Sequence, residues 1–189
     1  MGALSRLLLR LFGWQLQGNA PTAPRFVFIA SPHTSNWDFI WMLLAASALG
    51  FKISWLGKHT LFKAPFGGVM RWLGGVPIKR DSGGDYVTQI AAQFAAASTL
   101  ALAVPVEGTR GRSEHWRSGF FYIAQAAQVP VVFSYLDYGR RLVGIGPTLA
   151  PGLTLVETMN RARAFYDPMR GKYPHLSGPA RLKEEALDE

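Results

Sequence analysis

The feature that most constrains the fold is an alternation of short apolar runs with longer ones. The short runs are rich in β-branched and aromatic residues, as buried strands are, and the longer runs have the length of helices. Strands are predicted at 26–30, 51–56, 76–80, 100–106, 129–135 and 140–146, and helices at 39–49, 61–73, 86–97, 119–128 and 154–166. This order predicts an α/β fold: a single layered domain with a central, mostly parallel or mixed sheet flanked by helices.

The first 18 residues are predicted to form an amphipathic helix ahead of a domain at 19–189. Leu4, Leu7, Leu8, Leu11, Phe12 and Trp14 fall on one side of this helix, and Ser5, Arg6 and Arg10 on the other. Leucine and tryptophan opposite arginine suit a helix that lies in a lipid interface. An ordinary helix packed on the domain fits the same pattern equally well.

Two uncharged windows, 86–106 and 118–136, approach the length of a membrane span. Each contains glutamines and a proline, so we interpret each as a helix followed by a buried strand. The last nine residues, 181–189, are predicted to form a solvated helical tail.

Charge is distributed unevenly along the chain. The 189 residues carry a net charge of +8, and residues 1–80 hold nine Lys or Arg but only one acid, Asp38. A basic, aromatic-rich surface predicts an anionic partner: phospholipid headgroups, phosphorylated metabolites or nucleic acid. The sequence has no cysteine, which excludes a disulfide framework, a thiolate zinc site and a cysteine nucleophile.

Common catalytic motifs are missing. The sequence has no Gly-x-Ser-x-Gly elbow, no His-Glu-x-x-His, no Walker phosphate loop and no Gly-x-Gly-x-x-Gly. This argues against a common serine hydrolase, a zincin, a nucleoside triphosphatase and a dinucleotide enzyme. The four histidines are scattered, so a metal cluster has little support.

A histidine and an aspartate follow the first predicted strand of the domain. His33 and Asp38 would lie in a strand-to-helix turn, with Asp38 near the positive end of the helix dipole. There Asp38 can accept a hydrogen bond from one imidazole nitrogen and leave the other nitrogen free to act as a general base. A turn histidine beside a helix-capping aspartate is an equally simple interpretation of the spacing.

The strand at 100–106 delivers Glu107-Gly-Thr-Arg110 to its carboxyl end, where α/β sheets bind ligands. Here Gly108 lets a ligand approach the backbone, and Arg110 offers a bidentate fork for phosphate. Lys79 and Arg80 end an earlier strand; they form either an anion-binding site or a solvated strand end.

Four blocks together resemble those of the glycerolipid acyltransferase family, which includes 1-acylglycerol-3-phosphate acyltransferases. The blocks are His33-Thr-Ser-Asn-Trp-Asp38, Gly75-Val-Pro-Ile-Lys-Arg80, Glu107-Gly-Thr-Arg110 and Val129-Pro-Val-Val-Phe133. The resemblance implies acyl transfer from acyl-CoA or acyl-carrier protein to the hydroxyl of a lysophospholipid. 1-Acylglycerol-3-phosphate is the leading candidate for the acceptor. Another lysolipid or a lipid-like alcohol remains an alternative acceptor.

The same resemblance implies roles for individual residues. His33 would be the general base and Asp38 its orienter. Glu107, Gly108, Thr109 and Arg110 would line the acceptor site, with Arg110 on its phosphate and with Lys79 and Arg80 adding contacts. The expected partners are the lysophospholipid, the thioester donor and a membrane surface, without nucleic acid, metal or bound cofactor. We expect a peripheral protein at the cytoplasmic face of a membrane.

Two alternatives remain from the sequence. A non-catalytic, basic lipid- or nucleic-acid-binding module would explain the charge and the interleaved aromatic residues. A phosphoester hydrolase could use the same histidine and basic groups, although spaced metal ligands are lacking.

Overall fold

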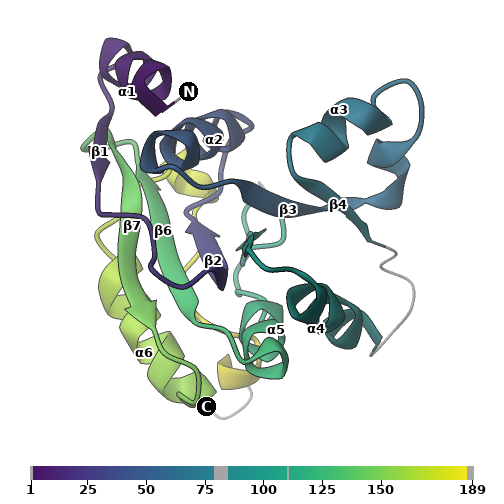
Figure 1. The fold of residues 1–189 in the computed structure, drawn as a ribbon. Helices are drawn as coiled ribbons and strands as arrows, with labels where there is room; N and C mark the ends of the chain where they lie inside the picture. Colours follow the sequence, from purple (N-terminus) through teal and green to yellow (C-terminus); the bar gives the residue numbers. More distant parts are fainter. Residues whose placement is uncertain (1, 79–84, 110, 187–189) are drawn as a thin grey trace.

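The computed structural model describes residues 2–78, 85–109 and 111–186, and Figure 1 shows the arrangement of its elements. Within these residues the strands form one seven-stranded sheet in the order β1-β7-β6-β2-β5-β3-β4. The strands are β1 (Gln15–Gln17), β2 (Arg25–Ser31), β3 (Ile53–Lys58), β4 (Gly75–Ile78), β5 (Leu100–Val104), β6 (Val131–Asp137) and β7 (Leu142–Leu149). Neighbouring strands are parallel except β6 and β7, which are antiparallel. The predicted α/β domain with a mixed sheet is confirmed.

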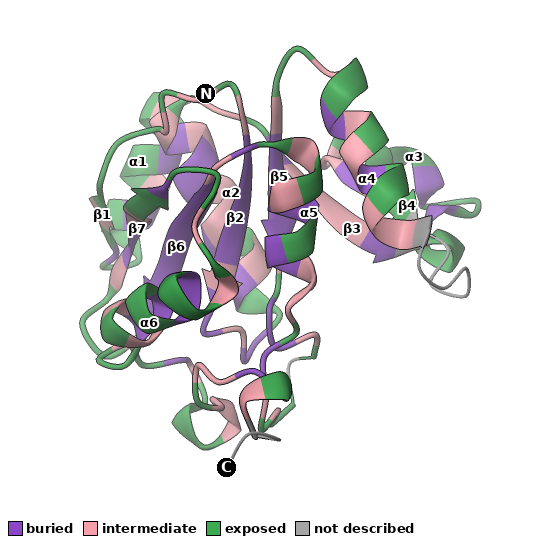
Figure 2. Cartoon of the chain, turned by 90° about the horizontal axis from the view of Figure 1, so that it is seen from below, coloured by how far each residue is buried: buried purple, intermediate pink, exposed green. Residues whose placement is uncertain are grey.

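Helices cover both faces of the sheet. They are α1 (Gly2–Leu11), α2 (Trp37–Leu49), α3 (Gly67–Trp72), α4 (Asp85–Ala96), α5 (Gly119–Ala127) and α6 (Leu155–Tyr166), with short 3₁₀ helices η1 (His59–Phe62), η2 (Pro174–Leu176) and η3 (Glu184–Ala186). Because side chains alternate along a strand, β2 faces both layers. Val27 and Ile29 join the core that holds Phe120 of α5, whereas Phe28 packs in a cluster with Ala46 of α2. Figure 2 shows β6, β2 and β5 buried at the centre.

The N-terminal helix α1 packs one side against α2 and leaves another side exposed. Leu9 is buried, and the Ser5 hydroxyl, expected on the solvent side, is buried against α2 instead. Leu4, Leu7 and Leu11 remain exposed. The chain then continues into the edge strand β1, which pairs with β7 and which the sequence analysis did not predict.

The segment predicted as one helix at 61–73 is divided in two. The 3₁₀ helix η1 ends at Phe62, and α3 begins only at Gly67. Pro65 lies between them, where it lacks the backbone N–H that a continuous helix needs. The prediction of a single helix here was wrong.

The two uncharged windows are each a helix followed by a strand, as predicted: α4 with β5, and α5 with β6. Among the helices of the described residues, none combines the length and apolar character that a membrane span requires.

The prediction of a solvated helical tail is wrong for residues 181–186. Leu182 is fully buried, and the backbone N–H of Trp116 donates to the Arg181 carbonyl at 2.7 Å. Glu185 forms an ion pair with Arg163 at 2.7 Å. The buried leucine, the backbone hydrogen bond and the ion pair together hold this segment on the domain; residues 187–189 lie outside the described residues.

Leu182→Ala should therefore destabilise the fold by about 2–5 kcal/mol, because it leaves a cavity at a buried site. The free energy of unfolding in urea measures this loss. Lys183→Ala, at an exposed neighbouring position, is the matched control and should change stability little. Equal stability of the two variants would contradict the packing of this segment.

Candidate active site

The candidate site lies where β2 and β5 end side by side. After β2 the chain continues into α2, which packs on the face of the sheet that carries Phe28. After β5 it continues into α5, which packs on the opposite face. A crevice at such a switch point is the usual ligand site of an open α/β sheet. The β2–β5 register pairs Ile29 with Val104, so the residues that follow each strand are neighbours. This register brings His33 and Glu107 together across 74 positions of sequence.

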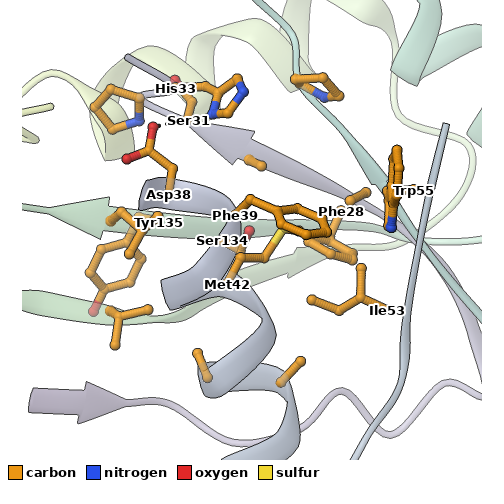
Figure 3. A pocket seen from close by; sticks show the side chains of 18 of the residues that line it. Phe28, Ser31, His33, Asp38, Phe39, Met42, Ile53, Trp55, Ser134 and Tyr135 are labelled. Carbon is orange, nitrogen blue, oxygen red and sulfur yellow. Dashed lines mark hydrogen bonds and ion pairs between the residues drawn. The ribbon is translucent and has the colours of Figure 1, made fainter. Parts of the chain in front are cut away.

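His33 and Asp38 form the predicted pair. His33 Nδ1 lies 3.2 Å from Asp38 Oδ2, and the imidazole is partly exposed whereas the carboxylate is buried. With Nδ1 held by a carboxylate, the neutral ring carries its proton on Nδ1, and Nε2 is left as the base. Figure 3 shows the two side chains together at one end of a pocket.

Asp38 also closes the turn that carries His33. Its Oδ2 accepts the backbone N–H groups of Thr34 and Ser35, both at 2.9 Å. Asp38 lies in the first turn of α2, where the helix dipole favours a negative charge. Thus the same carboxylate satisfies the backbone of the turn and contacts the imidazole. Asp38 is not the N-cap of α2, which is Asn36, so the interpretation as a helix cap was wrong in detail; the orienting role stays a prediction.

Tyr138 is a third member of this network that the sequence analysis missed. Its hydroxyl donates to Asp38 Oδ1 at 2.7 Å. Burial raises the pKa of the Tyr138 hydroxyl, and the adjacent Asp38 carboxylate raises it further, so the hydroxyl stays protonated as a donor. Tyr138 directly follows β6, so it lies at the same carboxyl end of the sheet as His33. This position after a strand is the sequence signal that could have identified it.

Glu107 supports the loop from the other side. Its Oε1 accepts the Ser31 hydroxyl at 2.9 Å, and its Oε2 accepts the His33 backbone N–H at 2.8 Å. Burial raises the pKa of the Glu107 carboxyl, while these two hydrogen bonds favour the charged form and oppose the rise. The carboxylate is directed at the His33 loop, and its predicted role in lining an acceptor site stays a prediction.

Gly108 and Thr109 line the same pocket as His33 and Asp38. Gly108 has a φ of +69°, and a Cβ there would lie 2.5 Å from Nε of Arg117, so the turn requires glycine. The other three predicted contacts, Lys79, Arg80 and Arg110, lie outside the described residues. The expectation that His33 and Arg110 open onto one cleft therefore stays a prediction.

The pocket extends from the His33–Asp38 pair between α2 and the sheet. Its volume is about 800 Å³, and most of its lining is apolar. The apolar side chains include Phe28, Phe39, Met42, Ile53 and Trp55 (Figure 3). A long apolar pocket with a few polar groups at one end is suited to an amphipathic ligand. The described residues contain no group of three or more His, Cys, Asp or Glu that could hold a metal ion.

A partly exposed histidine held by a buried aspartate, at the end of an apolar pocket, has the geometry that a general base requires. Residues 14–134 match the Acyltransferase family, and the chain belongs to this family. No curated protein matches the sequence.

Among solved structures, the chain is similar to the 1-acyl-sn-glycerophosphate (LPA) acyltransferase PlsC from Thermotoga maritima. The TM-score is 0.58 with 17% sequence identity, and the match covers 85% of this chain and 72% of that one. At this identity the similarity shows that the two proteins share a fold.

Tyr138→Phe should lower kcat about tenfold while the fold and the acceptor KM stay nearly unchanged. A hydrogen bond to a charged group contributes about 1.5–3 kcal/mol, and the other donors to Asp38 would retain part of its orientation. Steady-state acyl transfer measures the effect. Tyr122→Phe, which alters a half-exposed tyrosine on α5, is the control. An unchanged kcat in Tyr138→Phe would remove Tyr138 from the positioning network.

Glu107→Ala should lower kcat more than it raises the acceptor KM, because it leaves the Ser31 hydroxyl and the His33 N–H without their acceptor. Each unpaired buried group costs about 1–3 kcal/mol, so stability should fall as well. Glu107→Gln is the matched variant: its amide oxygen can accept from His33 while its amide N–H donates to Ser31. A raised KM with unchanged kcat would instead indicate direct contact with the acceptor.

Proposed function

We propose that this acyltransferase moves a fatty acyl group from acyl-CoA or acyl-carrier protein to the free hydroxyl of a lysophospholipid. The leading acceptor is 1-acylglycerol-3-phosphate, which would become phosphatidate. The observation that carries the proposal is the His33–Asp38 pair at the end of a large apolar pocket. Such a pocket supports a substrate with a long hydrocarbon chain.

The chemistry follows from the free Nε2 of His33. It takes the proton of the acceptor hydroxyl as that oxygen attacks the thioester carbonyl. The tetrahedral intermediate then expels the thiol sulfur, which receives the proton back from His33, and an ester bond has replaced the thioester bond. No acyl-enzyme is required, which agrees with the lack of cysteine and of a serine elbow.

Recognition of the acceptor phosphate is assigned to three cations of the family blocks. We infer that Arg110, Lys79 and Arg80 contact it, in keeping with their places in the family blocks. Arg117, a described residue, packs beside Gly108 and adds positive charge to the Gly108 turn.

Membrane attachment is the remaining part of the proposal. The exposed leucines of α1, with Arg6 and Arg10 also exposed, support a helix that lies in the lipid interface. Trp14 and Leu9 are buried in the domain, so attachment is better tested by substituting exposed leucines than by deleting residues 1–16. A peripheral position at a membrane would place the site close to its lipid substrates.

A non-catalytic binding module is the second candidate. Its support is the basic surface, but binding alone gives no reason to hold an imidazole on a buried carboxylate that already accepts three other donors.

His33→Ala should lower turnover by about 10²–10⁴-fold, the usual contribution of a general base. Turnover is measured as thioester consumption with lysophosphatidate, lysophosphatidylcholine and monoacylglycerol, and product mass identifies the preferred acceptor. His175→Ala, at an exposed histidine, is the control. Equal turnover of wild type and His33→Ala would refute the assigned base, whereas a preference for monoacylglycerol would refute the phosphate acceptor alone.

Met42→Trp should shift the donor preference toward shorter acyl chains, because the larger side chain occupies part of the pocket. The ratio of kcat/KM for two thioesters of different chain length measures the shift. Met42→Leu, which conserves volume, should leave the ratio nearly unchanged. An unaltered ratio in Met42→Trp would mean that the acyl chain lies elsewhere.

A further inference from the structure

A second apolar surface, apart from α1, lies on the segment made of η1 and α3. Four large side chains point outward there: Leu61, Phe66, Val69 and Trp72, which we call the α3 patch. Trp72 is 82% exposed and Phe66 is 67% exposed. Scattered apolar residues are normal on a protein surface, but Phe66, Val69 and Trp72 recur at every third position along α3, so neighbouring members of the set are close on the helix surface.

The segment is held in place with these side chains outward. Phe62 is its buried residue, and Gly67 packs so tightly on it that a Cβ would lie 2.1 Å from the Phe62 carbonyl oxygen. At the other end of α3, Trp55 Nε1 donates to the Leu73 carbonyl at 3.0 Å. The segment is therefore attached through the Phe62 ring, the Trp55 hydrogen bond and close backbone contacts. The side chains of the α3 patch are not part of the core.

The charged residues within and next to the segment, in positions 52–73, are all cations. Lys52, Lys63 and Arg71 are exposed, and the guanidinium of Arg71 lies 5.6 Å from the Phe62 ring centroid. Between residues 2 and 78 the only acidic residue is Asp38, which is buried in the site. Exposed aromatic and aliphatic side chains interspersed with cations match the boundary between headgroups and acyl chains of an anionic bilayer.

The position of the segment connects this surface to the pocket. Leu61 and Met70, which belong to it, line the pocket that begins at His33. Helix α1, which carries the exposed leucines, lies on the other side of α2 from α3 (Figure 1). The two apolar surfaces therefore flank the helix that forms one wall of the pocket.

We propose that the α3 patch is a second lipid-contact surface, which inserts into the interface of an anionic bilayer beside the pocket. The inference rests on the proposed function in that a lipid substrate would reach the pocket past Leu61 and Met70. Contact at α1 alone would leave the molecule free to tilt, whereas contact on both sides of α2 fixes the pocket against the bilayer.

Single-site labelling tests the proposal directly, because the chain contains no cysteine. Trp72→Cys and Val156→Cys give one labelling site each, the latter on the exposed surface of α6 on the opposite face of the sheet. Each is labelled with an environment-sensitive fluorophore and mixed with phosphatidylglycerol or phosphatidylcholine vesicles. We expect a blue shift at position 72 with phosphatidylglycerol, and none at position 156.

Partition of full-length variants gives the second measurement. Phe66→Ser/Val69→Ser/Trp72→Ser should lower the partition coefficient on phosphatidylglycerol vesicles about tenfold or more. Tyr122→Ser/Val156→Ser, which removes exposed apolar side chains from α5 and α6, should not lower it. Trp72→Ser alone, at a side chain outside the core, keeps the test valid if the triple variant is unstable.

Either of two labelling results would overturn the proposal: no blue shift at position 72 when the protein is bound to vesicles, or equal shifts at 72 and 156. Absence of vesicle binding would overturn it as well. Acyl transfer to a dispersed short-chain acceptor is measured in parallel. Vesicle insertion without acyl transfer would refute the proposed function but support the lipid-contact surface. Acyl transfer without insertion would support the proposed function but refute the lipid-contact surface.

Discussion

The arrangement of the site depends on one buried carboxylate. Asp38 accepts two backbone N–H groups, a tyrosine hydroxyl and an imidazole nitrogen, so its four partners come from the turn before α2 and from the end of β6. A buried carboxylate is costly unless such donors surround it, and the donors hold it in one orientation. The imidazole of His33 contacts this carboxylate, so its orientation is fixed as well. The conformation of the turn, the start of α2 and the orientation of the imidazole all depend on the same set of contacts.

The sheet supplies the partners of that carboxylate. β2 is central and lies between β5 and β6, so the residues that follow all three strands meet at one edge. Glu107 after β5 and Tyr138 after β6 reach the loop after β2 from its two sides. A change in the register of β2 would separate these groups, which makes strand pairing as important for the site as the side chains themselves.

The sequence predicted the layered fold and the His33–Asp38 pair, because apolar periodicity and the spacing after a strand are local signals. It placed Tyr138 just after a strand but not beside Asp38, because that contact spans 100 positions and depends on the strand order. Nor did it reveal that Glu107 is directed at the His33 loop, because a buried carboxylate and a substrate-binding one look the same in a sequence. Leu182 was missed since its burial depends on a tertiary contact among charged neighbours.

The central claim is that Asp38 sets the tautomer of His33, with the proton on Nδ1 and Nε2 bare. Imidazole ¹⁵N NMR of the labelled protein, at a pH where the ring is neutral, measures this directly, and His33→Ala identifies the His33 signals among the four histidines. The account predicts a protonated-nitrogen shift for Nδ1 and a bare-nitrogen shift for Nε2 in wild type, and a mixture of tautomers in Asp38→Leu. A proton on Nε2 in wild type would contradict it.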